Sequence, residues 1–132
     1  MSVGIDTSVA LRLLTGEPAD QSEVARELLA TAPTPVAISD LVVAETYFAL
    51  RHHYGVPHAE AVRVLLALVS DPDISAPGVS RAVLSAEGAS RVSKSLPGLV
   101  DRLIHADYRR DDLKLITFDR ALGRLERVRV LE

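Results

Sequence analysis

The chain contains no cysteine. Disulfide bonds, thiolate metal sites and a cysteine nucleophile are therefore excluded, and the absence fits a reducing compartment. Long apolar runs are also missing, since the longest is VLLALV at residues 64–69, whereas a membrane-spanning helix needs about 20 apolar residues. The first residues reach Asp6 too early for an apolar targeting segment. We therefore expect a cytoplasmic protein that is not inserted in a membrane.

An excess of positive charge is absent as well, because the net charge is −3. This balance argues against a generic basic arm that binds nucleic acid. The charges are nevertheless unevenly distributed: residues 1–90 hold 5 basic and 11 acidic residues, whereas residues 91–132 hold 10 basic and 7 acidic residues. Such asymmetry is compatible with an acidic site beside a basic surface that faces phosphate, and also with a helical surface of scattered arginines.

The size and composition suit one folded unit. The chain has 132 residues, of which 48% are hydrophobic and 25% are charged, close to the values of ordinary globular proteins with a buried core. No internal repeat, low-complexity segment or linker interrupts the sequence. We therefore expect a single domain over residues 1–132.

Short apolar segments alternate with helical patterns along the chain. Strands are predicted at residues 2–5, 36–38, 113–118 and 127–131, with a further short strand possible within 71–78. Helices are predicted at residues 7–15, 20–32, 40–54, 57–70, 79–93 and 99–110, with a short helix or turn at 120–125. This alternation predicts an α/β fold of βαβ units, in which helices cover both faces of a parallel sheet.

One predicted helix carries a carboxylate on the side that is expected to face the core. Its residues at the spacing of an apolar stripe are Leu41, Ala44, Glu45 and Phe48. Glutamate is almost never fully buried unless it is paired or binds a metal. Glu45 therefore either contributes to an acidic pocket or lies at the edge of the stripe with its head group in water.

Three aspartates are placed where an α/β fold positions ligands. Asp6 and Asp119 each follow a predicted strand, and ligands bind beyond the carboxyl ends of such strands. Asp101 lies in the first turn of a helix, where the helix dipole favours its ionised form. Each could alone be an ordinary helix cap. Gathered with Glu45, they would repel one another unless a cation joined them, and an all-oxygen site suits Mg²⁺ or Mn²⁺.

Two hydroxyl groups flank these acids. Thr7 directly follows Asp6, and Thr117 lies two residues before Asp119. Each hydroxyl can bond a carboxylate, a metal-bound water or a phosphate, but a threonine at a strand end or helix start is also an ordinary cap. For Thr7 capping is the preferred interpretation.

Four segments together resemble the PIN-domain ribonucleases, and most of all the VapC toxins of bacterial toxin–antitoxin pairs. In order, these are GIDTSVALRLLTGEP, AISDLVVAETYFALRHHYGV, LVDRLIHADYRR and LKLITFDRAL. The resemblance covers nearly the whole chain. It implies a PIN-like three-layer α/β/α sandwich with a central, mostly parallel sheet of four or five strands. It also implies that Asp6, Glu45, Asp101 and Asp119 are the catalytic, metal-binding acids, and that Thr117 matches the hydroxyl that often precedes the last acid.

The same resemblance implies an activity and partners. The protein would be an endoribonuclease that depends on Mg²⁺ or Mn²⁺, forms a homodimer and is inhibited by a cognate antitoxin protein. The alternative is a PIN-fold module with little or no cleavage that binds RNA or a protein partner. Receiver domains and haloacid-dehalogenase-type phosphatases fit less well, because each needs a second acid near the first strand and Asp6 stands alone there.

The sequence departs from the family pattern at two positions. Ser8 replaces the usual asparagine, and His105 replaces a small residue on the face of Asp101. His105 either contacts RNA phosphate or a metal-bound water, or is a partly buried histidine with a satisfied ring. The candidate arginines for phosphate contact are Arg102 and Arg120, which adjoin proposed ligands, followed by Arg109 and Arg110.

Overall fold

A computed structural model describes residues 2–86, 89, 91–93 and 95–132. Its strands are parallel and form two sheets. The first sheet has β2 at its centre and contains β1 (Gly4–Ile5), β2 (Val36–Ile38) and β3 (Ile74–Ser75). The second sheet contains β4 (Leu115–Thr117) and β5 (Val128–Val130).

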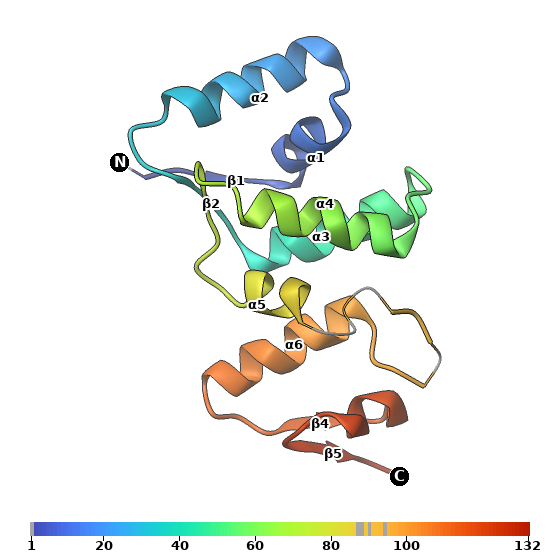
Figure 1. The fold of residues 1–132 in the computed structure, drawn as a ribbon. Helices are drawn as coiled ribbons and strands as arrows, with labels where there is room; N and C mark the ends of the chain where they lie inside the picture. The colour runs from blue at the N-terminus through green and yellow to red at the C-terminus, as the bar shows by residue number, and fades with distance from the viewer. Residues whose placement is uncertain (1, 87–88, 90, 94) are drawn as a thin grey trace.

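The helices lie on both sides of the three-stranded sheet (Figure 1), with α1 and α2 above β1 and β2 in that view and α3 and α4 below. Their bounds are α1 Thr7–Thr15, α2 Ala19–Thr31, α3 Asp40–His52, α4 His58–Val69, α5 Ser80–Ser85, α6 Leu99–Arg110 and the 3-10 helix η1 Arg120–Arg124. The predicted α/β class is confirmed. None of the helices described is long and apolar enough to cross a membrane.

Local capping chemistry sets the helix ends. The Asp6 side chain accepts a bond from the Val9 amide at the start of α1, and Ser39 does the same for the Val42 amide at the start of α3. Gly16 ends α1 in the left-handed region with φ 71°, which glycine adopts without steric penalty. The helix predicted over 79–93 ends at Ser85, and part of its remainder falls outside the residues that the structure describes.

The hydrophobic core surrounds the central strand. Val36 and Ile38 of β2 pack with buried residues of α3 and α4, among them Val43, Leu65 and Val69. Helix α6 joins this core through two leucines, Leu99 and Leu103. Leu115 of β4 and Leu122 of η1 are also buried but do not belong to this cluster. These two leucines are therefore buried outside the main core.

The predicted strands do not form one continuous sheet. In the described part of the chain β4 pairs with β5 and not with β1, and helices α3, α5 and α6 separate the two sheets in Figure 1. Helix α6 is anchored in the main core through Leu99 and Leu103, and β4 begins five residues after its last residue, Arg110. We refer to residues 99–130, which contain α6, β4, η1 and β5, as the C-terminal unit.

Candidate functional site

Asp6 sits at the carboxyl end of β1 and caps α1. Its Oδ1 accepts hydrogen bonds from the Ser8 hydroxyl at 2.6 Å and from the Val9 amide at 3.2 Å. Both bonds lower the pKa of the exposed Asp6 carboxyl because they favour its charged form, and the bond from the Ser8 hydroxyl has the larger effect. Ser8 therefore keeps a hydrogen-bonding role at the position where it replaces the family's asparagine, and Thr7 is the first residue of α1 and half-buried.

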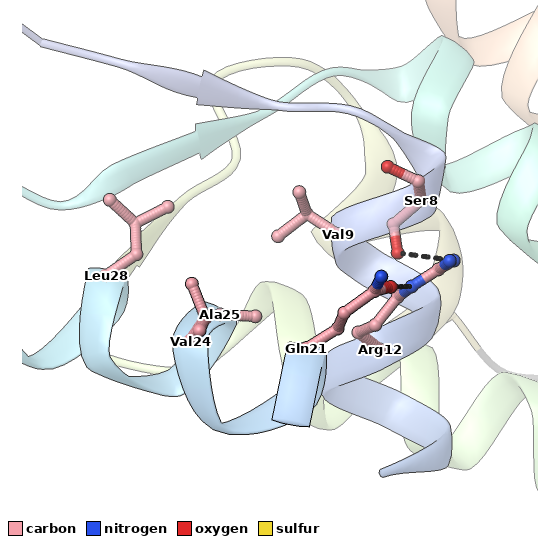
Figure 2. A pocket seen from close by; sticks show the side chains of 7 residues that line it. All are labelled: Ser8, Val9, Arg12, Gln21, Val24, Ala25 and Leu28. Carbon is pink, nitrogen blue, oxygen red and sulfur yellow. Dashed lines mark hydrogen bonds between the residues drawn. The ribbon is translucent and has the colours of Figure 1, made fainter. Parts of the chain in front are cut away.

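An apolar groove lies beside this carboxylate, between α1 and α2. Figure 2 shows Val9 facing Val24, Ala25 and Leu28, with polar residues at the other end of the groove. The groove has a volume of about 340 Å³. At its polar end Arg12 donates to the Gln21 side chain at 2.8 Å and to the Ser8 carbonyl oxygen at 3.3 Å.

Glu45 lies on the outer side of α3, and the predicted apolar stripe was the wrong face of this helix. The buried residues of α3 are Val43, Thr46 and Leu50. Leu41 is 78% exposed and Phe48 48% exposed, and Glu45 between them is exposed as well. The structure thus supports the interpretation in which the head group of Glu45 meets water, although Ala44 of the same stripe is partly buried against the core.

Asp40, the first residue of α3, has partners far along the chain. Its carboxylate accepts hydrogen bonds from the backbone amides of Val79 and Ser80 at 3.0–3.1 Å, and from the Ser80 hydroxyl. Asp40 thereby caps α5, a role that the sequence did not reveal because the partners are about 40 positions away. Glu45 follows five positions later, which at 100° per residue turns its side chain about 140° away from Asp40.

Asp101 and Asp119 form the one pair of predicted acids with a resolved electrostatic interaction. Burial, followed by the negative charge of Asp119, raises the pKa of the half-buried Asp101 carboxyl group, while a backbone hydrogen bond from Gly98 opposes the shift. Asp101 lies in the first turn of α6 and Asp119 directly precedes η1. The C-terminal unit therefore contributes a carboxylate pair by itself.

Thr117 holds the segment that carries Asp119. The Thr117 hydroxyl oxygen accepts the Asp119 amide at 2.9 Å, and the Asp119 carboxylate accepts the Ala121 amide at 2.9 Å. Arg120, next to Asp119, is exposed at the start of η1. Thr117 is thus placed to position the acid, in the place where the resemblance expects a hydroxyl.

The remaining predicted residues have structural partners. Arg102 donates to the Pro97 carbonyl oxygen at 3.2 Å, and His105 donates from Nε2 to the Glu126 carbonyl oxygen at 2.7 Å. His105 is half-buried and its Nε2 has a partner within the chain, which favours the structural role over contact with RNA. Arg109 and Arg110 form ion pairs with Glu126 and Asp107.

The four acids do not come together in a single chain. Among the residues that the structure describes, no three His, Asp or Glu side chains are close enough to hold a metal ion together. The expected four-carboxylate pocket is therefore not formed, because Asp6 and Glu45 belong to the main core region and Asp101 and Asp119 to the C-terminal unit. Asp101 and Asp119 are the two of these acids that could hold a divalent ion within one chain, because Mg²⁺ is usually bound by one or two carboxylates together with waters and substrate phosphates.

One buried polar contact was not anticipated from the sequence. The His58 ring donates from Nε2 to the Ala89 carbonyl oxygen at 2.8 Å, so its Nδ1 accepts the Tyr47 hydroxyl at 2.6 Å. His58 is buried at the start of α4. The contact fixes α4 to α3 and to the segment before α6, and no local motif signals it.

Comparison with known proteins gives one family. The family model of the PIN domain matches residues 3–128, a range that includes all four predicted acids and every strand except the last two residues of β5. No curated protein sequence matches the chain.

Proposed function

This chain belongs to the PIN domain family, and from this membership we propose that it is an endoribonuclease that hydrolyses RNA phosphodiester bonds with Mg²⁺ or Mn²⁺. PIN domains suggest nuclease-type function and typically use divalent metal ions. The proposed catalytic and metal-binding acids are Asp6, Glu45, Asp101 and Asp119. The observation that supports this most is that Asp119, just after β4, lies near enough to Asp101 in the first turn of α6 for its charge to raise the Asp101 pKa, since groups with perturbed pKa values are frequent at functional sites.

The surrounding side chains are suited to hold an RNA backbone. Arg120 is exposed beside Asp119, and Arg102 follows Asp101, so both can attract a phosphate to the carboxylate pair. Arg102 is partly committed to the Pro97 carbonyl oxygen, which makes Arg120 the freer of the two. Thr7 and Thr117 offer hydroxyl groups next to the proposed ligands.

We further propose that the protein acts in the cytoplasm as the toxin of a toxin–antitoxin pair. A homodimer and a cognate antitoxin partner are part of this proposal, and they rest on the resemblance to VapC toxins. Growth arrest after induction of the wild-type chain, and normal growth with Asp6→Asn, are the expected results. Growth arrest by both chains would contradict a nuclease toxin that uses Asp6.

The direct test is cleavage of a labelled single-stranded RNA by the purified protein. Mg²⁺ or Mn²⁺ should support cleavage, EDTA should stop it, and Asp6→Asn and Asp119→Asn should each abolish it with the fold intact by circular dichroism. Asp20→Asn and Asp111→Asn are matched controls, because both residues are exposed acids outside the proposed site. Cleavage in EDTA, or unchanged cleavage by Asp6→Asn, would overturn the proposal.

The alternative is a PIN-fold module that binds RNA or a protein without cutting. What favours this alternative is that the four acids are not assembled in one chain. Calorimetric titration with Mn²⁺ separates the two functions, because a non-catalytic module need not bind a divalent ion. Tight RNA binding without cleavage and without metal binding would support the module.

A further inference from the structure

We propose that Phe118 is a stacking platform for an unpaired RNA base beside Asp119, and that basic side chains around it hold the neighbouring phosphates. Phe118 lies on the face of the second sheet that also carries Lys114, Ile116 and Arg129, which we call the open face. The inference deepens the proposed function, because it names RNA with unpaired bases as the substrate, and its effect on cleavage rests on that function.

Phe118 is the most exposed aromatic residue of the described chain. It is 76% exposed, whereas the next, Phe48, is 48% exposed and lies against the His52 ring. A phenylalanine ring stabilises a fold by being buried, so a ring left in water contributes little to this one. The Phe118 ring is therefore available to a ligand.

The backbone on both sides of Phe118 is held by hydrogen bonds. The Thr117 hydroxyl oxygen accepts the Asp119 amide at 2.9 Å, across Phe118, and the Thr117 carbonyl oxygen accepts the Leu131 amide at 2.7 Å. The Asp119 carboxylate in turn accepts the Ala121 amide. Phe118 is thus anchored next to the proposed catalytic carboxylate, and a base stacked on it brings its own phosphate toward Asp119.

The open face has an alternating pattern of exposure. Lys114, Ile116 and Phe118 are exposed, whereas Leu115 is buried and Thr117 is half-buried. Because successive side chains of a strand point to opposite faces, the exposed residues share one face of β4 and its flanks.

The neighbouring strand adds a cation to the same face. Arg129 of β5 is the register partner of Ile116 and is exposed. Helix α6 lies between this sheet and the main core (Figure 1). An apolar and aromatic surface with a flanking arginine therefore meets water in the described part of the chain.

Basic side chains without a partner gather around the open face. Most arginines of the described chain are engaged, and Arg109, Arg110 and Arg127 of the C-terminal unit form ion pairs. Among the described residues, the basic side chains with no ion pair or side-chain hydrogen bond are Arg26 on α2 and a group around the second sheet, namely Lys114, Arg120, Arg124 and Arg129. Such side chains can bind phosphate without first giving up a partner.

These features favour single-stranded RNA over a protein as the ligand. Proteins that bind single strands combine aromatic rings that stack with bases and positive charges that follow the backbone. The centre of a protein interface is depleted of charge, whereas Arg129 lies beside Ile116 on this face. Since every base has a face that can stack, we expect the platform to select unpaired bases rather than one sequence.

Binding of a labelled oligoadenylate in EDTA, where metal-dependent cleavage is absent, tests the platform. Phe118→Ala should weaken binding about five- to a hundredfold, the effect of losing one stacked base. Phe118→Leu should weaken it similarly, because leucine is apolar but has no ring, and Phe118→Trp should bind at least as tightly as the wild type. Val24→Ala, at an exposed valine of α2, is the control that should change nothing, and circular dichroism checks each fold.

Two results of this titration would overturn the proposal. One is unchanged affinity in Phe118→Ala. The other is full affinity in Phe118→Leu, which would show an apolar contact of the kind that a protein partner makes instead of base stacking.

Inorganic polyphosphate separates the charges from the ring. It carries phosphates but no bases, so Phe118→Ala should bind it as the wild type does, while Arg129→Gln should bind it more weakly. If Phe118→Ala lost as much affinity for polyphosphate as for oligoadenylate, the ring would not act by stacking and the proposal would be wrong.

A single tryptophan reports the stacking directly, because the chain has none of its own. Stacking on a base quenches indole emission, so oligoadenylate should quench the Phe118→Trp chain. A duplex RNA of the same length should not, since its bases are already paired, and Val24→Trp should be quenched by neither. Unquenched emission of Phe118→Trp at saturating oligoadenylate overturns the proposal.

Cleavage assays distinguish this inference from the proposed function. With an active wild type, Phe118→Ala should lower kcat/KM for single-stranded RNA mainly through a higher KM, and equal kcat/KM values would overturn the platform. A wild type that binds oligoadenylate through Phe118 but cleaves no RNA contradicts the proposed function and supports the platform.

Discussion

Asp101 and Asp119 are electrostatic neighbours that belong to different elements, the first turn of α6 and the residue before η1. Burial raises the pKa of the Asp101 carboxyl, and the charge of Asp119 raises it further. Both causes disfavour the ionised form of Asp101. A charged Asp101 therefore works against folding, as expected for a residue kept for function rather than for stability.

The first prediction is that Asp101→Asn stabilises the protein at neutral pH. A carboxyl with a raised folded-state pKa stabilises the fold below its unfolded pKa of about 3.9, and this contribution is lost as the pH rises through the folded value. The free energy of unfolding of Asp101→Asn should thus exceed that of the wild type at pH 7, and the difference should vanish in acid. Urea unfolding across this range measures it, with Asp111→Asn as control. A less stable Asn variant at pH 7 would refute the prediction.

The second prediction concerns the cap on α5. A Cβ added at Gly78 would overlap the Asp40 carboxylate that accepts the Val79 and Ser80 amides. Gly78→Ala should therefore lower the free energy of unfolding by about 1–3 kcal/mol, the cost of leaving buried polar groups unpaired. Gly4→Ala is a suitable control, since its Cβ would lie 3.5 Å from the nearest atom, in ordinary contact. Equal unfolding midpoints for the two variants would contradict this role of Asp40.

The third prediction concerns the buried histidine. Tyr47→Phe removes the hydroxyl that donates to His58 Nδ1 at 2.6 Å and leaves that nitrogen without its partner. The loss should be about 1–3 kcal/mol of unfolding free energy. Tyr108→Phe, at an exposed tyrosine, should change stability little. Thermal and urea unfolding of both variants check the difference, and similar losses from both would argue against a special role of the Tyr47 hydroxyl.

The fourth prediction concerns RNA binding. Arg120→Ala should weaken RNA binding several-fold and flatten the dependence of log K on log salt by about 0.7, the value for one phosphate contact on a single strand. Fluorescence anisotropy at several salt concentrations gives the slope. Arg26→Ala removes an exposed arginine from α2 and should leave the slope unchanged. An unchanged slope in Arg120→Ala would remove Arg120 from the phosphate-binding set.

Local signals in the sequence predicted the bounds of several helices and strands well. They did not predict contacts between residues that are far apart in the chain. The bounds of α1, α6 and β2 agree with the prediction because caps, glycine and apolar runs are local features. The outward face of α3 was misjudged because the buried side of this helix is decided by core contacts of Val43 and Leu50 with residues elsewhere in the chain. Alternation of strands and helices predicted parallel pairing, and this is confirmed. Such a pattern does not specify which strands are neighbours, and the expected single sheet included β4, which pairs with β5 in a second sheet.

The candidate site was predicted residue by residue but not as an assembly. The sequence placed Asp6 and Asp119 after strands and Asp101 in the first turn of a helix, and the structure agrees on each position. Their assembly depends on the placement of α6, whose anchoring leucines look like those of any amphipathic helix. The local sequence pattern thus predicts where each residue lies within its helix or strand. It does not predict the distance between Asp6 and the pair Asp101 and Asp119.

Asp6 and Glu45 differ in how much freedom they retain. Asp6 is already bonded to Ser8 and Val9, so its carboxylate is preorganised and cannot swing away without loosening the first turn of α1. Glu45 extends from an exposed helix face, and ordering such a side chain costs up to about 2 kcal/mol of rotamer entropy. Binding of a ligand at Asp6 would therefore cost little conformational entropy, whereas binding at Glu45 would require its side chain to become ordered.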